Sequence, residues 1–250
     1  MSSGILYGIG VGPGDPDLIT VKAAKILSRC KHVFAPRPQS SPESTSAKIV
    51  QRHLNPLGQV YDVVFPMSSD STVLEAQWLA ATAPIAEVLA AGSDACYLTL
   101  GDTMVYSTYV YMLRALRSRM PDVRVITIPG ITSFSAAAAL AEIPLGEGEQ
   151  YLTVVPASAG REVLSRALST GGTVAVMKIG KRLEEVLEVL DYEKALDRSV
   201  LVSRAGMDNQ RTERDLRRLK SDIPDGMGNL SIILVRGEAP GGQDGPDGEK

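Results

Sequence analysis

The sequence predicts an α/β protein with two domains, and three observations support this. Short apolar runs alternate with helical patterns through residues 5–128, which is typical of a parallel sheet covered by helices on both faces. A second series of such elements follows Pro129-Gly130, so we place the domain boundary at Ile128. The chain has 250 residues, of which 44% are apolar, which by length is enough for one large domain or two small ones and leaves enough apolar residues for a sizeable core.

The first domain, residues 1–128, is predicted to contain strands that are mostly bounded by Gly or Pro. These strands span residues 5–11, 32–36, 60–65, 95–100 and 123–128. Helices are predicted between them at residues 21–29, 45–54, 73–91 and 106–119. Thr20 is placed to cap the first helix. Pro84 should kink or split the third helix, and Gly92 lies where a helix commonly ends.

The second domain, residues 129–237, is predicted to open with an Ala-rich helix at residues 132–141. Further helices are expected near residues 161–168 and 182–190. The expected strands span residues 151–155, 173–178, 199–204 and 230–235. Residues 238–250 are rich in Gly, Pro and acids, and we predict a disordered acidic tail there.

Composition and charge exclude several classes of protein. Lys and Arg total 26 against 29 for Asp and Glu, a net charge of −3, and the tail alone, with four acids and Lys250, accounts for that −3. The rest of the chain is neutral, so no nucleic-acid partner is expected. No apolar run reaches the roughly 18 residues of a membrane helix, so no membrane partner is expected either.

Other residue types set the expected compartment and chemistry. The N-terminus lacks the basic region of a signal peptide, and the two cysteines, Cys30 and Cys96, are far apart in the sequence. We therefore expect a cytoplasmic protein. His32 and His53 lie near no other obvious ligand, so we expect no metal site and structural roles for both histidines.

A glycine-rich segment, GIGVGPGDP at residues 8–16, follows the first predicted strand. Glycines let a ligand approach the backbone closely. The spacing differs from a dinucleotide fingerprint because Pro13 takes the position of the third glycine and has no amide donor. A nicotinamide oxidoreductase is therefore disfavoured, whereas a ligand-binding loop and a purely structural turn both remain open.

A second segment, YLTLGDTMVYSTY at residues 97–109, ends a buried strand and opens a helix. Open α/β sheets bind ligands beyond the carboxyl ends of their strands. Gly101 would let a ligand meet the backbone there, and Asp102 could accept hydrogen bonds from it. Asp102 could equally cap the following helix. Three tyrosines and two hydroxyl residues crowd this turn, which favours a pocket.

Three further features have a functional and a structural interpretation each. Thr132 and Ser133 could contact a ligand or cap the Ala-rich helix. Lys178 could meet an anionic substrate or lie in solvent at a strand end. A basic run in the last third of the chain suits a polycarboxylate or phosphate ligand, or a salt-bridged surface helix. The run consists of Arg198, Arg204, Arg211, Arg214, Arg217, Arg218 and Lys220.

Together and in this order, these segments resemble the tetrapyrrole (corrin/porphyrin) methylase family over about residues 5–236. The motifs that carry the resemblance are GVGPGDPDLIT at residues 10–20, LGD at 100–102, PGITS at 129–133 and Gln210-Arg211. Phe65-Pro66-Met67, residues 98–109 and residues 177–181 are similar to the branch that methylates C-20 of precorrin-2. Thr103 departs from the usual Pro of the family, and Ala205-Gly206 from its frequent Gly-Thr. Asp102 is retained, so we expect cofactor binding to be retained.

The resemblance implies two α/β domains, the first with a largely parallel sheet and the second with a mixed sheet. It also implies S-adenosyl-L-methionine in the cleft between them, S-adenosyl-L-homocysteine as product, and a homodimer. The expected reaction is methylation of C-20 of precorrin-2 or cobalt-precorrin-2 in cobalamin biosynthesis. The implied cofactor contacts are Pro13, Leu100, Gly101, Asp102, Val105, Thr132, Ser133, Met177 and Ala205.

The same resemblance makes the substrate a tetrapyrrole whose carboxylates lie near Lys178 and the basic run. A proton must leave the methylated carbon, and Asp102, Tyr106 and Lys178 are the candidates for assisting its loss. Two alternatives remain open. One is another tetrapyrrole methylase, such as a uroporphyrinogen III methyltransferase or a different precorrin methylase. The other is a non-catalytic sensor that binds the cofactor or a tetrapyrrole.

Overall fold

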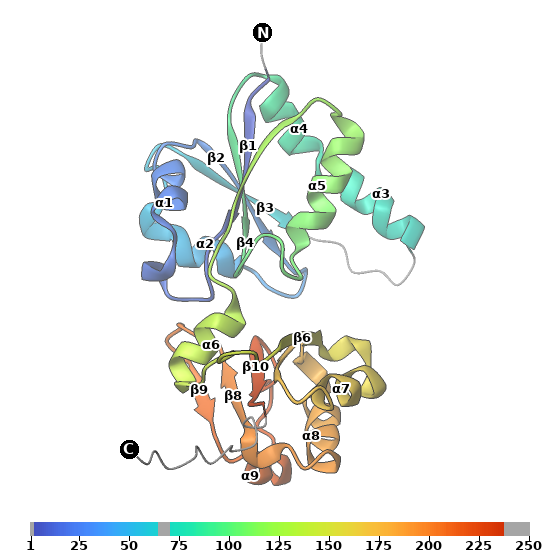
Figure 1. The fold of residues 1–250 in the computed structure, drawn as a ribbon. Helices are drawn as coiled ribbons and strands as arrows, with labels where there is room; N and C mark the ends of the chain where they lie inside the picture. The colour runs from blue at the N-terminus through green and yellow to red at the C-terminus, as the bar shows by residue number, and fades with distance from the viewer. Residues whose placement is uncertain (1–2, 65–70, 238–250) are drawn as a thin grey trace, which may run out of the picture. The chain divides into compact units, whose positions relative to one another are not determined.

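A computed structural model describes residues 3–64 and 71–237 (Figure 1). The Phe65-Pro66-Met67 segment and the predicted tail at residues 238–250 lie outside the described residues. Contacts between Cα atoms divide the chain into two compact units, Met1–Ser133 and Phe134–Lys250. We refer to these units as the first and second domains.

The first domain is built on a five-stranded sheet in the order β3-β2-β4-β1-β5, in which every neighbouring pair is parallel. The parallel sheet predicted from strand and helix alternation is therefore confirmed. Its strands are β1 (Ile5–Gly10), β2 (His32–Arg37), β3 (Gln59–Val64), β4 (Ala95–Thr99) and β5 (Arg124–Ile128). Every residue of β4 is buried, as expected of a central strand whose two faces are both covered.

Helices cover both faces of this sheet, with α1 and α2 on one side and α3, α4 and α5 on the other (Figure 1). Their bounds are α1 (Val21–Leu27), α2 (Thr45–Val50), α3 (Ser71–Ala81), α4 (Ala83–Ala90) and α5 (Thr108–Arg119). Short 3₁₀ turns lie at Pro16–Leu18 and Gln51–His53.

Three local predictions for these helices are confirmed. Thr20 caps α1, its side chain accepting a hydrogen bond from the Ala23 amide at 3.3 Å. The helix predicted over residues 73–91 is split, and Pro84 lies in the first turn of α4, where its missing amide costs nothing. Gly92 follows α4 with a φ of 81°, the left-handed conformation that ends many helices.

The second domain contains a mixed sheet in the order β6-β7-β10-β8-β9. Only β6 and β7 pair in parallel, and the other neighbours are antiparallel, as the resemblance implied. The strands are β6 (Leu152–Pro156), β7 (Thr173–Met177), β8 (Ser199–Ser203), β9 (Arg211–Glu213) and β10 (Ser231–Val235). The helices are α6 (Ser133–Ala141), α7 (Arg161–Leu168), α8 (Leu183–Tyr192) and α9 (Leu216–Ser221), with 3₁₀ turns at Ala157–Ala159, Gly180–Arg182 and Leu196–Arg198.

Two of these elements, β9 and α9, were missed because they lie inside the basic run, which has no apolar periodicity. β9 has three residues, Arg-Thr-Glu, at an edge of the sheet. α9 is capped by Asp215, whose carboxylate accepts a hydrogen bond from the Arg218 amide at 3.0 Å. Among the described residues, no helix has the length and apolar character needed to cross a membrane.

Candidate functional site

In the first domain, three loops leave the sheet at the carboxyl ends of the neighbouring strands β4, β1 and β5. The loops after β1 and β4 are joined by a pair of backbone hydrogen bonds. The Gly12 amide donates to the Gly101 carbonyl at 3.2 Å, and the Gly101 amide donates to the Gly12 carbonyl at 2.7 Å. The two motifs that the sequence places far apart thus form one structure at this edge.

Glycines are required where the three loops touch. A Cβ on Gly130 would lie 2.2 Å from the Gly101 carbonyl oxygen, and one on Gly10 would lie 2.5 Å from the Gly130 amide nitrogen. Gly101 itself has a φ of 72°, and its nearest neighbours would be Ile131 and Ser133 at 3.9 and 4.0 Å. The loops therefore contact one another through their backbones. The space beside Gly101 is not filled by these contacts and could hold atoms of a ligand.

Asp102 clamps two of these loops with both of its carboxylate oxygens. Oδ1 accepts a hydrogen bond from the Met104 amide at 2.8 Å, and Oδ2 accepts one from the Gly130 amide at 2.9 Å. The alternative that Asp102 caps the following helix is wrong, because Ser107 occupies the cap position of α5. Asp102 instead fixes the loop after β4 against the loop after β5.

The crowd of tyrosines predicted to line a pocket is mostly core. Tyr97 and Tyr109 are both 0% exposed and pack among apolar side chains between the sheet and α3, α4 and α5. Burial raises the pKa of the Tyr109 hydroxyl above its ordinary value. Of the three tyrosines in residues 97–109, Tyr106 alone is exposed, at 42%, and it adopts a positive φ of 48°. The sequence did not distinguish these tyrosines because all three are close to the same strand end.

The same edge holds the other first-domain residues that the resemblance implied. Pro13 is buried in the loop after β1, Leu100 and Val105 are half-buried after β4, and Thr132 and Ser133 are half-buried after β5. Neighbouring parallel strands end at one edge of a sheet, which is why residues 13, 100–105 and 132–133 gather there. The structure therefore brings these residues to one edge of the first domain.

In the second domain, the ends of β7 and β8 and the start of β10 share one edge, since β10 runs antiparallel between the other two. Met177 and Ala205 lie at this edge, and both are buried. One steric glycine occurs here as well, because a Cβ on Gly228 would lie 2.0 Å from the Gly180 carbonyl oxygen. Both second-domain residues of the implied cofactor set thus lie at one sheet edge.

Three residues at this second edge adopt a positive φ although they are not glycines. They are Lys178 at 55°, Arg204 at 51° and Leu230 at 54°. The Arg204 amide donates to the Leu230 carbonyl at 2.9 Å, which continues the β8–β10 pairing by one step. Desolvation lowers the pKa of the Lys178 ammonium, although the residue keeps an exposed surface. These conformations could not be predicted from the residue types, since none of the three residues is Gly or Asn.

The basic run divides into members with different surroundings. Arg217 forms a bidentate pair with Asp197 at 2.7 and 2.6 Å, and Lys220 pairs with Asp191 at 2.6 Å. These hydrogen bonds lower the pKa of both carboxyls. The salt-bridged surface helix, one of the two interpretations of the run, therefore describes α9.

The remaining arginines of the run are arranged differently. Arg198 donates to the Arg236 carbonyl at 2.6 Å, and Arg214 donates to the Ala141 carbonyl at 2.8 Å. Arg211 is exposed and pairs in register with Ser203, so it lies on β9 at the same edge as Arg204. The run is therefore not one continuous patch.

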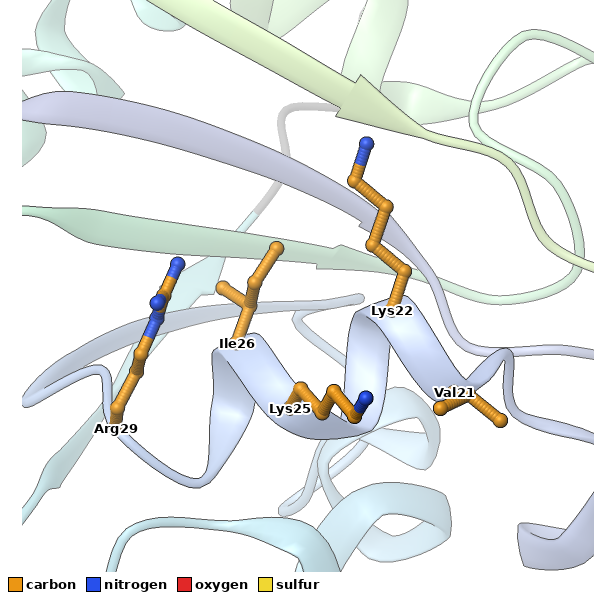
Figure 2. A pocket seen from close by; sticks show the side chains of 5 residues that line it. All are labelled: Val21, Lys22, Lys25, Ile26 and Arg29. Carbon is orange, nitrogen blue, oxygen red and sulfur yellow. The ribbon is translucent and has the colours of Figure 1, made fainter.

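A cavity of about 410 Å³ lies beside α1, and it is lined by Val21, Lys22, Lys25, Ile26 and Arg29. None of these residues belongs to the loops that follow β1, β4 and β5. Figure 2 shows that the three cationic side chains do not converge on one point, so they do not form a preorganised anion site.

The fold and the edges described above define an α/β protein with loops gathered at the carboxyl ends of its strands, and within residues 3–64 and 71–237 no group of His, Cys, Asp or Glu side chains is arranged to hold a metal ion. Residues 5–219 match the family of Tetrapyrrole (Corrin/Porphyrin) Methylases. The chain belongs to this family, as the sequence motifs predicted.

Curated relatives cover nearly the whole chain. It is 33% identical over 233 residues to a cobalt-precorrin-2 C(20)-methyltransferase of Salmonella typhimurium, spanning 93% of this chain and 96% of that protein. It is 32% identical over 251 residues to a precorrin-2 C(20)-methyltransferase of a Sinorhizobium species, spanning 97% and 98%.

A solved structure shares the fold. The uroporphyrin-III C-methyl transferase from Thermus thermophilus, in complex with S-adenosyl homocysteine, superposes with a TM-score of 0.64 at 19% identity. The match covers 93% of this chain and 97% of that one. At this level of identity the likeness concerns the fold alone.

Proposed function

We propose that this chain is an S-adenosyl-L-methionine-dependent methyltransferase that methylates C-20 of precorrin-2 or cobalt-precorrin-2 in cobalamin biosynthesis. The observation that carries the proposal is the similarity to the Salmonella typhimurium relative over 93% of this chain and 96% of that protein. Similarity at both ends of the chain supports a shared activity better than a shared motif would, because the loops of both domains are included.

The residues at the first-domain edge fit this cofactor. The contacts at Gly10 and Gly130 leave no room for side chains, while the space beside Gly101 is open to further atoms. We propose that Pro13, Leu100, Gly101, Asp102, Val105, Thr132 and Ser133 hold the cofactor, and on the resemblance alone that Met177 and Ala205 contribute. When bound, S-adenosyl-L-methionine would supply an electrophilic methyl group. Its product, S-adenosyl-homocysteine, is present in the structure of the Thermus thermophilus relative.

Asp102 is proposed to act as a positioning residue. Both of its oxygens accept backbone hydrogen bonds, from Met104 at 2.8 Å and from Gly130 at 2.9 Å, so it holds two loops in register. Correct placement of the reacting groups can account for much of the acceleration of a displacement reaction.

Tyr106 and Lys178 remain the proposed candidates for assisting loss of the proton from the methylated carbon. Tyr106 is 42% exposed, so part of the residue faces solvent at the first-domain edge. The lowered pKa of Lys178 brings its ammonium closer to the range in which an amine exchanges protons near neutral pH.

A homodimer and a cytoplasmic location are also part of the proposal. The dimer rests on the family resemblance. The location is supported by Cys30 and Cys96, which are both free thiols in the structure, as expected of a protein from a reducing compartment.

The first test is calorimetric titration with S-adenosyl-homocysteine, with NAD and ATP as controls. Micromolar binding of S-adenosyl-homocysteine alone supports the cofactor assignment, whereas no binding contradicts it. Turnover of precorrin-2 and of cobalt-precorrin-2, with mass and NMR analysis of the product, then tests the methylated carbon. A methyl group on another carbon would indicate a different branch of the family, and binding without turnover would favour a sensor.

A further inference from the structure

The three residues with side chains and a positive φ at the second-domain edge lie side by side. Leu230 precedes β10, and Arg204 and Lys178 follow the strands on either side of it. The register pairs Ser231 with Ser203 and Ile233 with Val176, which places Arg204 beside Leu230 and Lys178 beside the start of β10. At a strand spacing of about 4.8 Å, the backbones of Lys178 and Arg204 are roughly 10 Å apart.

These conformations are costly for residues with a Cβ, and glycine would relieve the cost. Glycine is used freely nearby, since Gly180, Gly206 and Gly226 also have positive φ. At the first-domain edge, the glycines Gly12 and Gly101 adopt positive φ. A strained residue that keeps its side chain when glycine would be easier points to a use for that side chain.

Lys178 and Arg204 have no acidic partner among the residues that the structure describes. Within residues 3–64 and 71–237, no carboxylate lies within 4.0 Å of Lys178 or Arg204, in contrast to Arg217 and Lys220 on α9. Among the described residues, the hydrogen bonds of the Arg204 guanidinium go to neutral oxygens at 3.4 Å, those of Ser203 and Gly226. Its guanidinium therefore retains donors for a carboxylate ligand.

Leu230 adds an apolar surface between the two cations, because it is 48% exposed. A tetrapyrrole has matching chemistry, with an apolar ring and carboxylates around its periphery. We propose that Lys178, Leu230 and Arg204 form a substrate subsite, in which the two cations bind peripheral carboxylates and Leu230 contacts the ring. This inference rests on the proposed function and assigns substrate recognition to an edge of the second domain.

Replacement by glycine tests the proposal, because it removes the side chain and relieves the backbone at once. Lys178→Gly and Arg204→Gly are compared with Lys194→Gly as a matched control. Lys194 is also an exposed cation with a positive φ, 54°. It differs in position, because it lies between α8 and the 3₁₀ turn η5 (Leu196–Arg198), which leads into the start of β8. Lys194 is therefore toward the opposite edge of the sheet. All three variants should keep the melting temperature within about 2 °C of wild type, since strain relief offsets the greater freedom of the unfolded chain.

Two readouts separate this inference from the proposed function. Uroporphyrin, a stable porphyrin with eight carboxylates, serves as a non-reacting probe in a fluorescence titration. Lys178→Gly and Arg204→Gly should each weaken its binding about tenfold, and Lys194→Gly should not change it. In turnover assays of Arg204→Gly the KM for precorrin-2 should rise by a similar factor, with kcat within twofold of wild type. The Kd of S-adenosyl-homocysteine should stay within twofold of wild type in both Lys178→Gly and Arg204→Gly.

Several outcomes would overturn the subsite. Unchanged uroporphyrin binding in both variants, equal weakening in Lys194→Gly, or no uroporphyrin binding by the wild type would each do so. A loss of S-adenosyl-homocysteine affinity instead would reassign the two cations to the cofactor. Failure of the wild type to methylate precorrin-2, with the uroporphyrin result as expected, would contradict the proposed function while leaving a tetrapyrrole subsite.

Discussion

At the carboxyl edge of the first sheet, glycines occupy the tight contacts between loops, and Gly12 and Gly101 supply the positive φ values next to them. At the corresponding edge of the second sheet, Lys178, Arg204 and Leu230 adopt positive φ with their side chains in place. The first edge is thus shaped by backbone, and the second carries charge and apolar surface. Backbone can hold a small ligand closely, whereas side chains can distinguish one large ligand from another.

The largest expected effect is steric and falls on the first edge. Gly130→Ala would place a Cβ 2.2 Å from the Gly101 carbonyl oxygen, and the loops would have to separate. We expect a loss of about 3 kcal/mol in the free energy of unfolding of the first domain. Trp78, the single tryptophan, is buried in that domain, so its fluorescence during urea unfolding reports the change.

The matched control is Gly101→Ala in the same cluster. A Cβ there would meet nothing closer than 3.9 Å, so only the positive φ of 72° is unfavourable, at about 1 kcal/mol. Equal losses for the two variants would show that steric contact between the loops is not what requires glycine at residue 130.

The next effect concerns the clamp between the loops. Asp102→Ala removes both acceptors, for the Met104 amide and for the Gly130 amide. We expect the Kd of S-adenosyl-homocysteine to rise more than tenfold, a loss of at least about 1.4 kcal/mol, as measured by calorimetry. Asp122→Ala, at an exposed position of the same domain, should leave the Kd unchanged. Unchanged affinity in Asp102→Ala would refute the placement of the cofactor at this edge.

A smaller effect is expected at Tyr106, which lies at the first edge and, like Lys178, Arg204 and Leu230 at the second, adopts a positive φ although it is not a glycine. Tyr106 has a φ of 48°, so Tyr106→Gly should stabilise the first domain by up to about 1 kcal/mol in urea unfolding. The same variant should lower kcat, because the hydroxyl is lost. Tyr106→Phe isolates the hydroxyl and should lower kcat without the gain in stability. If kcat is unchanged in both variants, Tyr106 takes no part in proton loss.

The smallest effect is expected at the rim of the second edge. Arg211 is exposed on β9, one strand beyond Arg204, so Arg211→Gln should raise the KM for precorrin-2 by about threefold, which corresponds to less than 1 kcal/mol. Arg218→Gln on α9 is the control and should not change the KM. Equal effects in the two variants would indicate a diffuse attraction by net charge instead of a contact at the edge.

The parallel sheet could be predicted because its strands are short, mostly apolar runs, most of them bounded by Gly or Pro. The split at Pro84 and the cap at Thr20 followed from local chemistry for the same reason: each depends on residues within one or two turns of the chain. β9 could not be predicted in this way, since three charged or polar residues at a sheet edge are held by pairing with β8 rather than by their own pattern.

The candidate site was predictable in its segments but not in its contacts. The motifs indicated that Gly101 and Asp102 matter, yet the bond from Asp102 to the Gly130 amide spans 28 residues of sequence. The tyrosines show the same limit, since Tyr97 and Tyr106 follow one another closely in the chain and lie in core and solvent respectively. Which side of a strand or turn a residue faces depends on tertiary packing that composition does not reveal.

The buried ring of Tyr109 has a consequence for how this domain can change over evolutionary time. A Cβ on Gly8 would lie 2.2 Å from the Tyr109 ring carbon Cζ, and the ring is held in place by a 2.7 Å hydrogen bond between its hydroxyl and Thr127. Residue 8 is therefore free to mutate only after residue 109 has become smaller. The two positions, on β1 and α5, are epistatic, and the order in which substitutions arise decides which of them the protein survives.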